Sequence, residues 1–310
     1  MATYKEIQGF AVQNFSQDPV PSVAGWSSGG SLSTARNYLG GAGTLTAGLA
    51  FGGNTPPHTT ATEEYDGSSW TAGGALSTSR TGLGGCGTQT AGLAFGGYTP
   101  SLQNATEEYD GSSWTNGGNL GTARGDLAGA GIQTAALATA GYTTTASNST
   151  EEYDGSSWTS GGNYPASRYS IGSTGTQTAG LGFGGNPGSN LSGETNEYDG
   201  SSWTSSGAMN TPRAFMGASG VQTDSIAFAG QTPPRTIETE NYNGSTWSIL
   251  PATLGTARDG LAGAGTASAA LAFGGSTGSI TGATEEYQTF SEPNTFQNEG
   301  QVFYNDTENK

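Results

Sequence analysis

The strongest constraint on this chain is a repeat. Tryptophans recur along its 310 residues at intervals of 44, 44, 44, 45 and 44 residues. An arginine follows each of them after ten or eleven residues, and a tyrosine series keeps the same period. The three series are Trp26, Trp70, Trp114, Trp158, Trp203 and Trp247; Arg36, Arg80, Arg124, Arg168, Arg213 and Arg258; and Tyr65, Tyr109, Tyr153, Tyr198, Tyr242 and Tyr287. Because a fixed period of about 20–50 residues is the signature of repeat folds, six copies of one unit account for nearly the whole chain.

Within each copy, short extended segments alternate with turn signals. In the second copy a Gly/Ala-rich run from Leu83 to Gly87 precedes a G-T-Q-T turn, and an alternating apolar run covers Ala91 to Gly97. A variable loop, the sequence ATEEY, a DG turn and SSWT complete the unit. This pattern predicts a four-stranded antiparallel meander of strands a, b, c and d, with a tight c–d hairpin at the DG turn.

Six such units predict an all-β chain folded as a six-bladed β-propeller. Glycine supplies 54 residues, and we expect it where the inner strands crowd toward the axis, as in residues 39–43. In strand b, Leu49 and Phe51 stand two apart and share a face, as do Leu93 and Phe95. With the tryptophans, these faces should fill the core between blades.

The repeat resembles the kelch family. A Gly-Gly pair after strand b, a tyrosine about twelve residues later and a tryptophan five beyond it carry the resemblance, which covers residues 26–287. The pairs are Gly52-Gly53, Gly96-Gly97, Gly184-Gly185 and Gly274-Gly275, and Ala140-Gly141 and Ala229-Gly230 replace two of them. The resemblance implies a ring of six four-stranded blades and says little about function.

The repeat is out of phase with the chain ends. The first strand met is a strand d near Trp26, and the last is a strand c near Tyr287. We therefore expect a composite closing blade, with strand d from residues 23–30 and strands a, b and c from about 259–288, which leaves no free sheet edge. The expected organisation is an N-terminal arm (1–22), a propeller (23–289) and a C-terminal tail (290–310).

Because strand direction alternates, the near-identical a–b and c–d turns lie on one side of the ring, which we call the turn face. The b–c loops and d–a connections lie on the other side, which we call the loop face. The b–c loops differ from copy to copy, as in NTPPHTT (54–60), YTPSLQN (98–104) and NPGSNLSG (186–193). A uniform scaffold with diversified loops predicts a recognition surface, and drift of unconstrained loops is the alternative. The candidate ligand-binding residues are His58, Tyr98, Gln103, Tyr142, Asn190 and Arg235.

Composition excludes several other classes. The net charge of −16 disfavours a nucleic-acid partner, and no apolar stretch is long enough for a membrane helix. The first residues lack the pattern of a secretory signal. A single cysteine, Cys86, cannot form an internal disulfide, and a single histidine cannot build a multi-histidine metal site. We expect no cofactor, no metal and no enzymatic activity.

Repeated charged residues have structural interpretations. The six arginines could form a ring for an anionic ligand, but equivalent copies favour pairing with the Glu-Glu of strand c, such as Glu63 and Glu64, to brace a d–a connection. The aspartates of the DG turns, such as Asp66, offer one carboxylate per hairpin, which favours a turn role over calcium binding. Cys86 occupies the position of Ala42 in another copy, which indicates a small packing residue.

The termini carry a second resemblance. The segments YKEIQGFAVQNFSQDP and EGQVFYNDTENK are similar to segments of marine bacteriophage structural proteins, in which kelch-like GSSWT and TAR repeats occur on virion- or tail-associated chains. The resemblance implies a virion adhesin made in the host cytoplasm. Its terminal arms, on the turn side, would contact other virion proteins, and its loops a host-surface glycan or protein. The alternatives are structural decoration of a capsid or tail, and a cytosolic kelch-type protein-interaction module.

Overall fold

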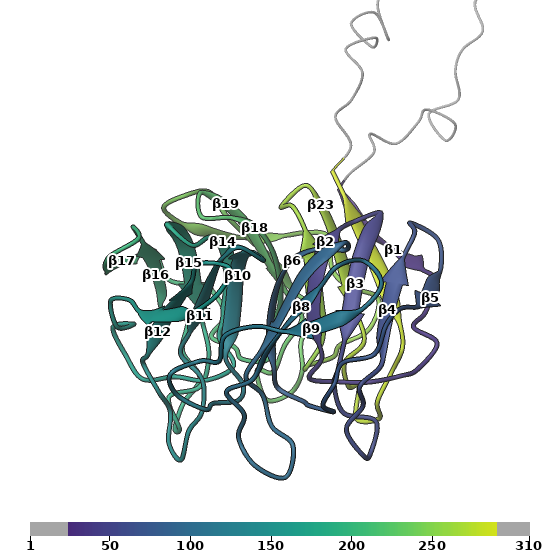
Figure 1. Ribbon diagram of the computed structural model, residues 1–310. Coiled ribbons are helices and arrows are strands. Elements are labelled where there is room, and N and C mark those ends of the chain that lie inside the picture. The colour runs from purple at the N-terminus through teal and green to yellow at the C-terminus, as the bar shows by residue number, and fades with distance from the viewer. Residues whose placement is uncertain (1–23, 290–310) are drawn as a thin grey trace, which may run out of the picture. The chain divides into compact units, whose positions relative to one another are not determined.

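The computed structural model describes residues 24–289, and this part of the chain is built from strands and turns alone (Figure 1). Its 24 strands form six four-stranded antiparallel sheets, arranged as the blades of a β-propeller. The predicted fold class is confirmed. None of these residues belongs to a helix that could cross a bilayer. The predicted arm (1–22) and tail (290–310) lie outside the described residues.

Each blade is a meander whose first strand lies nearest the axis. The blades are β2 (Gly40–Thr44), β3 (Ala47–Phe51), β4 (Thr62–Tyr65), β5 (Trp70–Ala72); β6 (Gly84–Thr88), β7 (Ala91–Phe95), β8 (Thr106–Tyr109), β9 (Trp114–Asn116); β10 (Ala128–Ile132), β11 (Ala135–Thr139), β12 (Thr150–Tyr153), β13 (Trp158–Ser160); β14 (Gly172–Thr176), β15 (Ala179–Phe183), β16 (Thr195–Tyr198), β17 (Trp203–Ser206); β18 (Gly217–Val221), β19 (Asp224–Phe228), β20 (Thr239–Tyr242), β21 (Trp247–Leu250); and β22 (Ala262–Gly265), β23 (Ala269–Phe273), β24 (Thr284–Gln288) with β1 (Gly25–Gly29).

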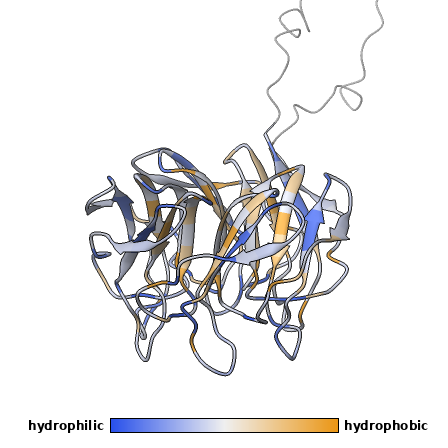
Figure 2. Cartoon of the chain, in the orientation of Figure 1, coloured by the Kyte–Doolittle hydropathy of each residue, from blue (hydrophilic) through white to orange (hydrophobic). Residues whose placement is uncertain are grey.

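Glycine lines the axis because the inner strands approach one another closely. A Cβ atom on Gly41 of β2 would lie 2.8 Å from the ring of Phe273 and 2.9 Å from the Cβ of Ala262, both in the closing blade. Strand b is the most buried element of every blade, and Figure 2 shows hydrophobic residues gathered on the strands nearer the axis. The glycine content therefore follows from the packing of six inner strands around one line.

The closing blade is composite, as the phase of the repeat predicts. β1 pairs with β24 from Gly25 opposite Gln288 to Gly29 opposite Thr284. The strands are slightly shorter than expected, because β1 spans residues 25–29 and β22 begins at Ala262. β1 begins and β24 ends on the turn face. The sheet edge that each chain end would otherwise expose is thus paired.

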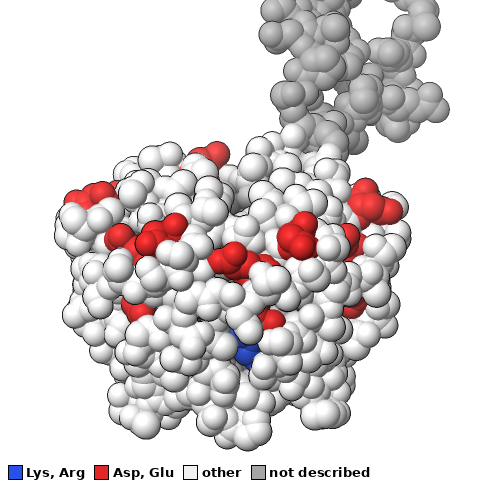
Figure 3. All heavy atoms as spheres, viewed as in Figure 1, with Lys and Arg blue, Asp and Glu red and all other residues white. Residues whose placement is uncertain are grey.

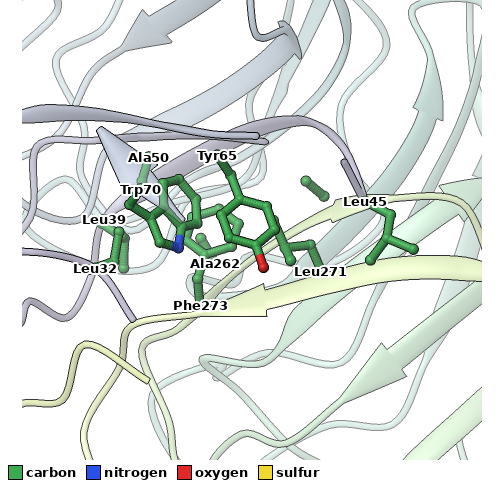
Figure 4. Packing of buried hydrophobic residues seen from close by; sticks show 10 residues of the cluster. Leu32, Leu39, Leu45, Ala50, Tyr65, Trp70, Ala262, Leu271 and Phe273 are labelled. Atoms are coloured by element: carbon green, nitrogen blue, oxygen red, sulfur yellow. The ribbon is translucent and has the colours of Figure 1, made fainter. Parts of the chain in front are cut away.

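A tryptophan joins each blade to the one before it. The Nε1–H of every strand-d tryptophan donates to the hydroxyl of the threonine that begins strand c of the preceding blade, at 2.8–3.0 Å. At the junction of the closing and first blades, the Trp70 ring also packs on Phe273, with 4.9 Å between centroids, beside Leu32 and Leu271 (Figure 4). Burial of each such large apolar side chain stabilises the fold by roughly 1.5–3 kcal/mol.

The junction between the third and fourth blades uses different residues. β11 ends at Thr139. In the five other blades strand b ends in a phenylalanine that contacts the tryptophan, and in the closing blade this residue is Phe273. Tyr164 stands where most copies have leucine, and its ring lies 4.9 Å from that of Trp203. The aromatic contact is thus retained by moving the second ring from strand b to the d–a connection.

The second glutamate of strand c ties neighbouring blades together. The Tyr109 hydroxyl donates to Oε1 of Glu64 in the preceding blade at 2.6 Å, and Tyr65 donates to Glu286 at 2.5 Å across the closing junction. Tyr153, Tyr198 and Tyr242 make the same bond. Asn241 stands at the glutamate position in the fifth blade. Burial and the hydrogen bond raise the pKa of Tyr109 to about 12, so the bond persists through neutral pH.

The turn face is built from capped hairpins. Oδ1 of Asp66 accepts the N–H groups of Ser68 and Ser69, each at 2.8 Å. These hydrogen bonds lower the pKa of Asp66 to about 2. Asp110, Asp154, Asp199 and Asn243 cap the equivalent turns. The predicted turn role of the aspartates is confirmed.

We expect deletion of residues 1–30 to cost far more stability than its length suggests. The deletion removes β1 and Trp26, whose Nε1–H binds Thr239 and whose ring lies 4.8 Å from Phe228. Loss of the half-buried Trp26 ring alone costs roughly 1.5–3 kcal/mol, and the deletion also opens a sheet edge. The denaturant midpoint should fall accordingly, whereas deletion of residues 1–22, which keeps β1, should leave it nearly unchanged. An equal midpoint for both truncations would contradict ring closure through β1.

Candidate functional site

The repeat arginines brace the variable loops from below. Arg36 is fully buried, and its Nη2 lies 3.1 Å from Oε1 of Glu63 in strand c. Its Nη1 donates to the carbonyl of Ala61 at the end of the b–c loop, at 2.9 Å. Burial lowers the pKa of Arg36, and Glu63 opposes the shift. The same pairing joins Arg80 to Glu107, Arg124 to Glu151, Arg213 to Glu240 and Arg258 to Glu285. The predicted structural role of the arginines is confirmed.

The first glutamate of each pair also holds a d–a connection. Oε2 of Glu63 accepts from the N–H and the hydroxyl of Ser33, both at 2.6 Å. The fourth blade departs from this pattern, because Asn196 replaces the glutamate and Arg168 pairs instead with Glu194, whose side chain is 64% exposed. Five loops therefore rest on a buried ion pair and the sixth on a surface one.

The Gly-Gly pair fixes where each b–c loop starts. The second glycine donates its N–H to the carbonyl of the arginine of the next blade, as Gly53 does to Arg80 at 2.8 Å. Gly53 has a φ of +104°, and a Cβ there would lie 3.0 Å from the carbonyl oxygen of Asn37. Ala140 and Ala229, which replace the first glycine in two blades, adopt the same left-handed conformation, with φ of 60° and 57°. Loop bases are therefore uniform even where loop tips differ.

A closed ring of backbone hydrogen bonds surrounds the axis on the loop face. Each member lies two residues after a repeat arginine and donates its N–H to the carbonyl of the equivalent residue in the preceding blade, at 2.7–3.1 Å. All six have positive φ, between 50° and 62°. The members of this axial ring are Tyr38, Gly82, Asp126, Ser170, Phe215 and Gly260. Four non-glycine residues hold a conformation that L side chains seldom adopt, which marks the ring as a constrained feature.

Sequence reasoning missed the axial ring as a site because it compared only the b–c loops among the repeats and not the d–a connections. The signal is present in the repeats as RNYL, RTGL, RGDL, RYSI, RAFM and RDGL. The arginine and the apolar residue at its third following position stay nearly constant, while the two residues between them vary. Diversified side chains therefore occur on the ring as well as on the b–c loops.

A cavity of about 280 Å³ opens above one side of the axial ring. Tyr38, Asp126 and Phe215 of the ring contribute to it, and Tyr98 and Tyr142 enter from b–c loops. The other lining residues are Thr81, Gly82, Leu102 and Gly125. Tyr98 and Tyr142 are 44% and 40% exposed, so their rings are available at the cavity entrance. We call this space the mouth cavity. Below it, three smaller cavities, of about 100–130 Å³, lie along the axis.

The remaining candidate residues lie around the mouth cavity rather than in it. The His58 ring contacts Tyr98, with 5.9 Å between centroids. Arg235 pairs through Nε with Oδ1 of Asp259 at 2.9 Å. The Gln103 amide donates to the carbonyl of Ser101 in its own loop, at 3.0 Å.

Asn190 lies on the fourth b–c loop, where it is exposed. That loop carries one more residue than the others, which also accounts for the spacing of 45. Of the six candidates, the structure thus brings Tyr98 and Tyr142 into one cavity.

Asp126 is the one charged residue that lines the mouth cavity. Its carboxylate lies over Gly82, where an added Cβ would come within 2.5 Å of Oδ1. Burial raises the pKa of Asp126 to about 6. Within residues 24–289, no group of three or more histidine, cysteine, aspartate or glutamate side chains is placed to hold a metal ion. The single cysteine, Cys86, is buried in β6 opposite Leu93, in the packing position that the sequence predicts.

No protein-family model matches this chain, and no curated protein matches it. The kelch and bacteriophage resemblances are therefore supported by the repeat landmarks and terminal segments alone. The structure itself shows a six-bladed β-propeller with four-stranded blades.

We expect Glu107→Gln to destabilise the protein by about 3–5 kcal/mol, because it leaves the fully buried Arg80 guanidinium without its partner at 2.7 Å. Glu194→Gln is the matched control. Its side chain is 64% exposed, so loss of its ion pair with Arg168 should cost less than about 1 kcal/mol. Urea denaturation measures both values, and similar losses for the two variants would contradict the bracing role of the buried pairs.

We expect Asp126→Asn to change the dependence of stability on pH. The pKa of Asp126 in the fold, about 6, lies above the ordinary value of 3.8, so ionisation of this carboxyl disfavours the folded state. Its stabilising contribution is complete below pH 3.8 and is lost as the pH rises through 6. Relative to the parent protein, the variant should gain roughly 1–2 kcal/mol between pH 4 and pH 7.5. Denaturant midpoints at these two pH values test this, and a constant difference would contradict it.

Proposed function

We propose that this protein is a non-enzymatic binding protein that recognises a host-surface glycan through its loop face, as a kelch-like propeller carried on a bacteriophage particle. One observation carries the proposal: residues that differ among the six repeats, on the b–c loops and the axial ring, gather around the mouth cavity on one face. A purely structural role gives no reason for that coincidence.

The loop face suits recognition because its backbone is held in advance. Ring hydrogen bonds, Gly-Gly bases and buried arginines fix each loop before a ligand arrives, so binding requires little further ordering. Exposed Tyr98 and Tyr142 offer flat apolar faces with polar edges, which suit the C–H faces and hydroxyls of sugars.

Charge on the surface also favours a glycan over a polyanion. Figure 3 shows acidic side chains in a band nearer the turn face, with little positive charge on the side in view. The exposed turn residues Asp66, Asp110, Asp154 and Asp199 belong to the turn face. The loop tips in this view are almost uncharged.

The virion setting is supported by the resemblance of the repeat and the termini to bacteriophage structural proteins. It also fits the position of Gly25 and Gln288, which are paired on the turn face, opposite the loops. Attachment of the protein through residues beyond these two would leave the loop face free to meet a host.

We expect the double variant Tyr98→Ala/Tyr142→Ala to lower retention on host cells or on an immobilised glycan library at least tenfold, because both entrance rings are lost. The control is Ile132→Ala/Val221→Ala, which removes two side chains that are 54% and 51% exposed on the turn face. The control should bind like the parent protein. Unchanged binding by the loop variant, with particles merely less stable when the protein is absent, would favour structural decoration instead.

A further inference from the structure

We propose that the mouth cavity receives an unacetylated amino sugar, and that the carboxylate of Asp126 is the counter-ion of its ammonium group. This inference rests on the proposed glycan recognition by the loop face and names the class of sugar. Its support comes from the charge, the walls and the size of the cavity.

The carboxylate of Asp126 has no protein partner among residues 24–289. Neither of its oxygens accepts a hydrogen bond there, and it forms no ion pair. Arg235, the arginine of the fifth b–c loop, is paired with Asp259 at 2.9 Å. A half-buried carboxylate without a partner is costly, and its raised pKa, about 6, reflects that cost. A ligand cation would donate hydrogen bonds and also neutralise the charge, whereas a neutral ligand would supply hydrogen-bond donors alone.

Aromatic rings form the walls around this carboxylate. The rings of Tyr38 and Phe215 meet edge to face across the axial ring, with 5.4 Å between centroids. Tyr38 and Asp126 line the same cavity, and burial followed by the charges of Asp259 and Asp126 raises the pKa of the Tyr38 phenol. Tyr98 and Tyr142 complete the entrance. Aromatic faces attract an organic cation and also pack against the C–H face of a sugar ring.

The size of the cavity limits the ligand. About 280 Å³ lies near the lower end of the ~300–1,000 Å³ typical of ligand pockets, which fits one sugar ring with its neighbours lying on the loops. An acidic sugar would be repelled by Asp126, and an N-acetylated sugar would present a neutral amide to the carboxylate. The free ammonium of an amino sugar would pair with the Asp126 carboxylate, and the aromatic rings would pack on its sugar ring.

The test compares the trimers of glucosamine and of N-acetylglucosamine by isothermal titration calorimetry at pH 7, with glucose and choline as further probes. We expect the glucosamine trimer to bind at least tenfold more tightly than the acetylated trimer, as for a charge-assisted hydrogen bond. Asp126→Asn should abolish this preference. Asp154→Asn, the matched control, removes the same charge on the turn face at a turn position that Asn243 fills in another blade, and should keep the preference.

The binding should also depend on pH. Affinity for the glucosamine trimer should rise several-fold from pH 4.5 to pH 6, where Asp126 ionises while the amine of the sugar stays protonated. The groups that face this carboxylate are the phenols of Tyr38, Tyr98 and Tyr142, with the pair of Asp259 and Arg235 beyond Tyr38.

His58 contacts Tyr98 at the entrance of the mouth cavity, so His58→Gln is the matched control variant. The rise with pH should persist in His58→Gln and disappear in Asp126→Asn.

Several results would overturn the inference: equal affinity for the two trimers, a preference that survives Asp126→Asn, tight binding of choline without binding of the glucosamine trimer, or no binding of that trimer. Each leaves the proposed function intact if the Tyr98→Ala/Tyr142→Ala variant still loses host binding. Conversely, the preference for the glucosamine trimer is lost in Asp126→Asn, and the Tyr98→Ala/Tyr142→Ala variant binds the host like the parent protein, if the sugar site exists but the proposed function is wrong. That combination would support the sugar site and contradict the proposed function.

Discussion

The structure depends on one junction, repeated until it closes on itself. At each junction a strand-d tryptophan donates to the threonine that begins strand c of the preceding blade, and packs on an aromatic ring that the preceding blade supplies at five junctions. Blades with only 17 to 19 strand residues bury their faces only against one another. The pairing of β1 with β24 supplies the last tryptophan, Trp26, and gives every blade two neighbours.

Closure explains how variable residues can occupy a constrained backbone. In the axial ring each N–H binds the carbonyl of the preceding blade, so the backbone path is set by the circle rather than by the side chain. Tyr38, Asp126 and Phe215 can therefore hold a left-handed conformation beside Gly82 and Gly260. Constant arginines support the loops from inside the blades. Diversity is thus confined to side chains on a fixed frame, which is the arrangement that the proposed recognition requires.

The period of the repeat and its turn signals were enough to predict six four-stranded blades and the composite closure, because every blade packs on its neighbours through the same residues. Exact strand ends were less predictable: β7 stops at Phe95, since Gly96 and Gly97 turn away with positive φ. The exchange of Phe for Thr139 and Leu for Tyr164 shows that one aromatic contact can come from two elements. Asp126 could not be predicted as a site residue, because its importance arises from two other blades that bring Tyr38 and Phe215 to the same cavity.

Native-state hydrogen exchange of the full chain tests ring closure most directly. In a closed ring no blade is terminal, so the amides of β1 should exchange with about the same opening free energy as those of β9 and β13, the equivalent outer strands of interior blades. The N–H groups of the axial ring should exchange only through global unfolding. Opening of β1 at much lower free energy, or a graded loss of protection from the closing blade inward, would contradict the account, because both are the behaviour of an open stack.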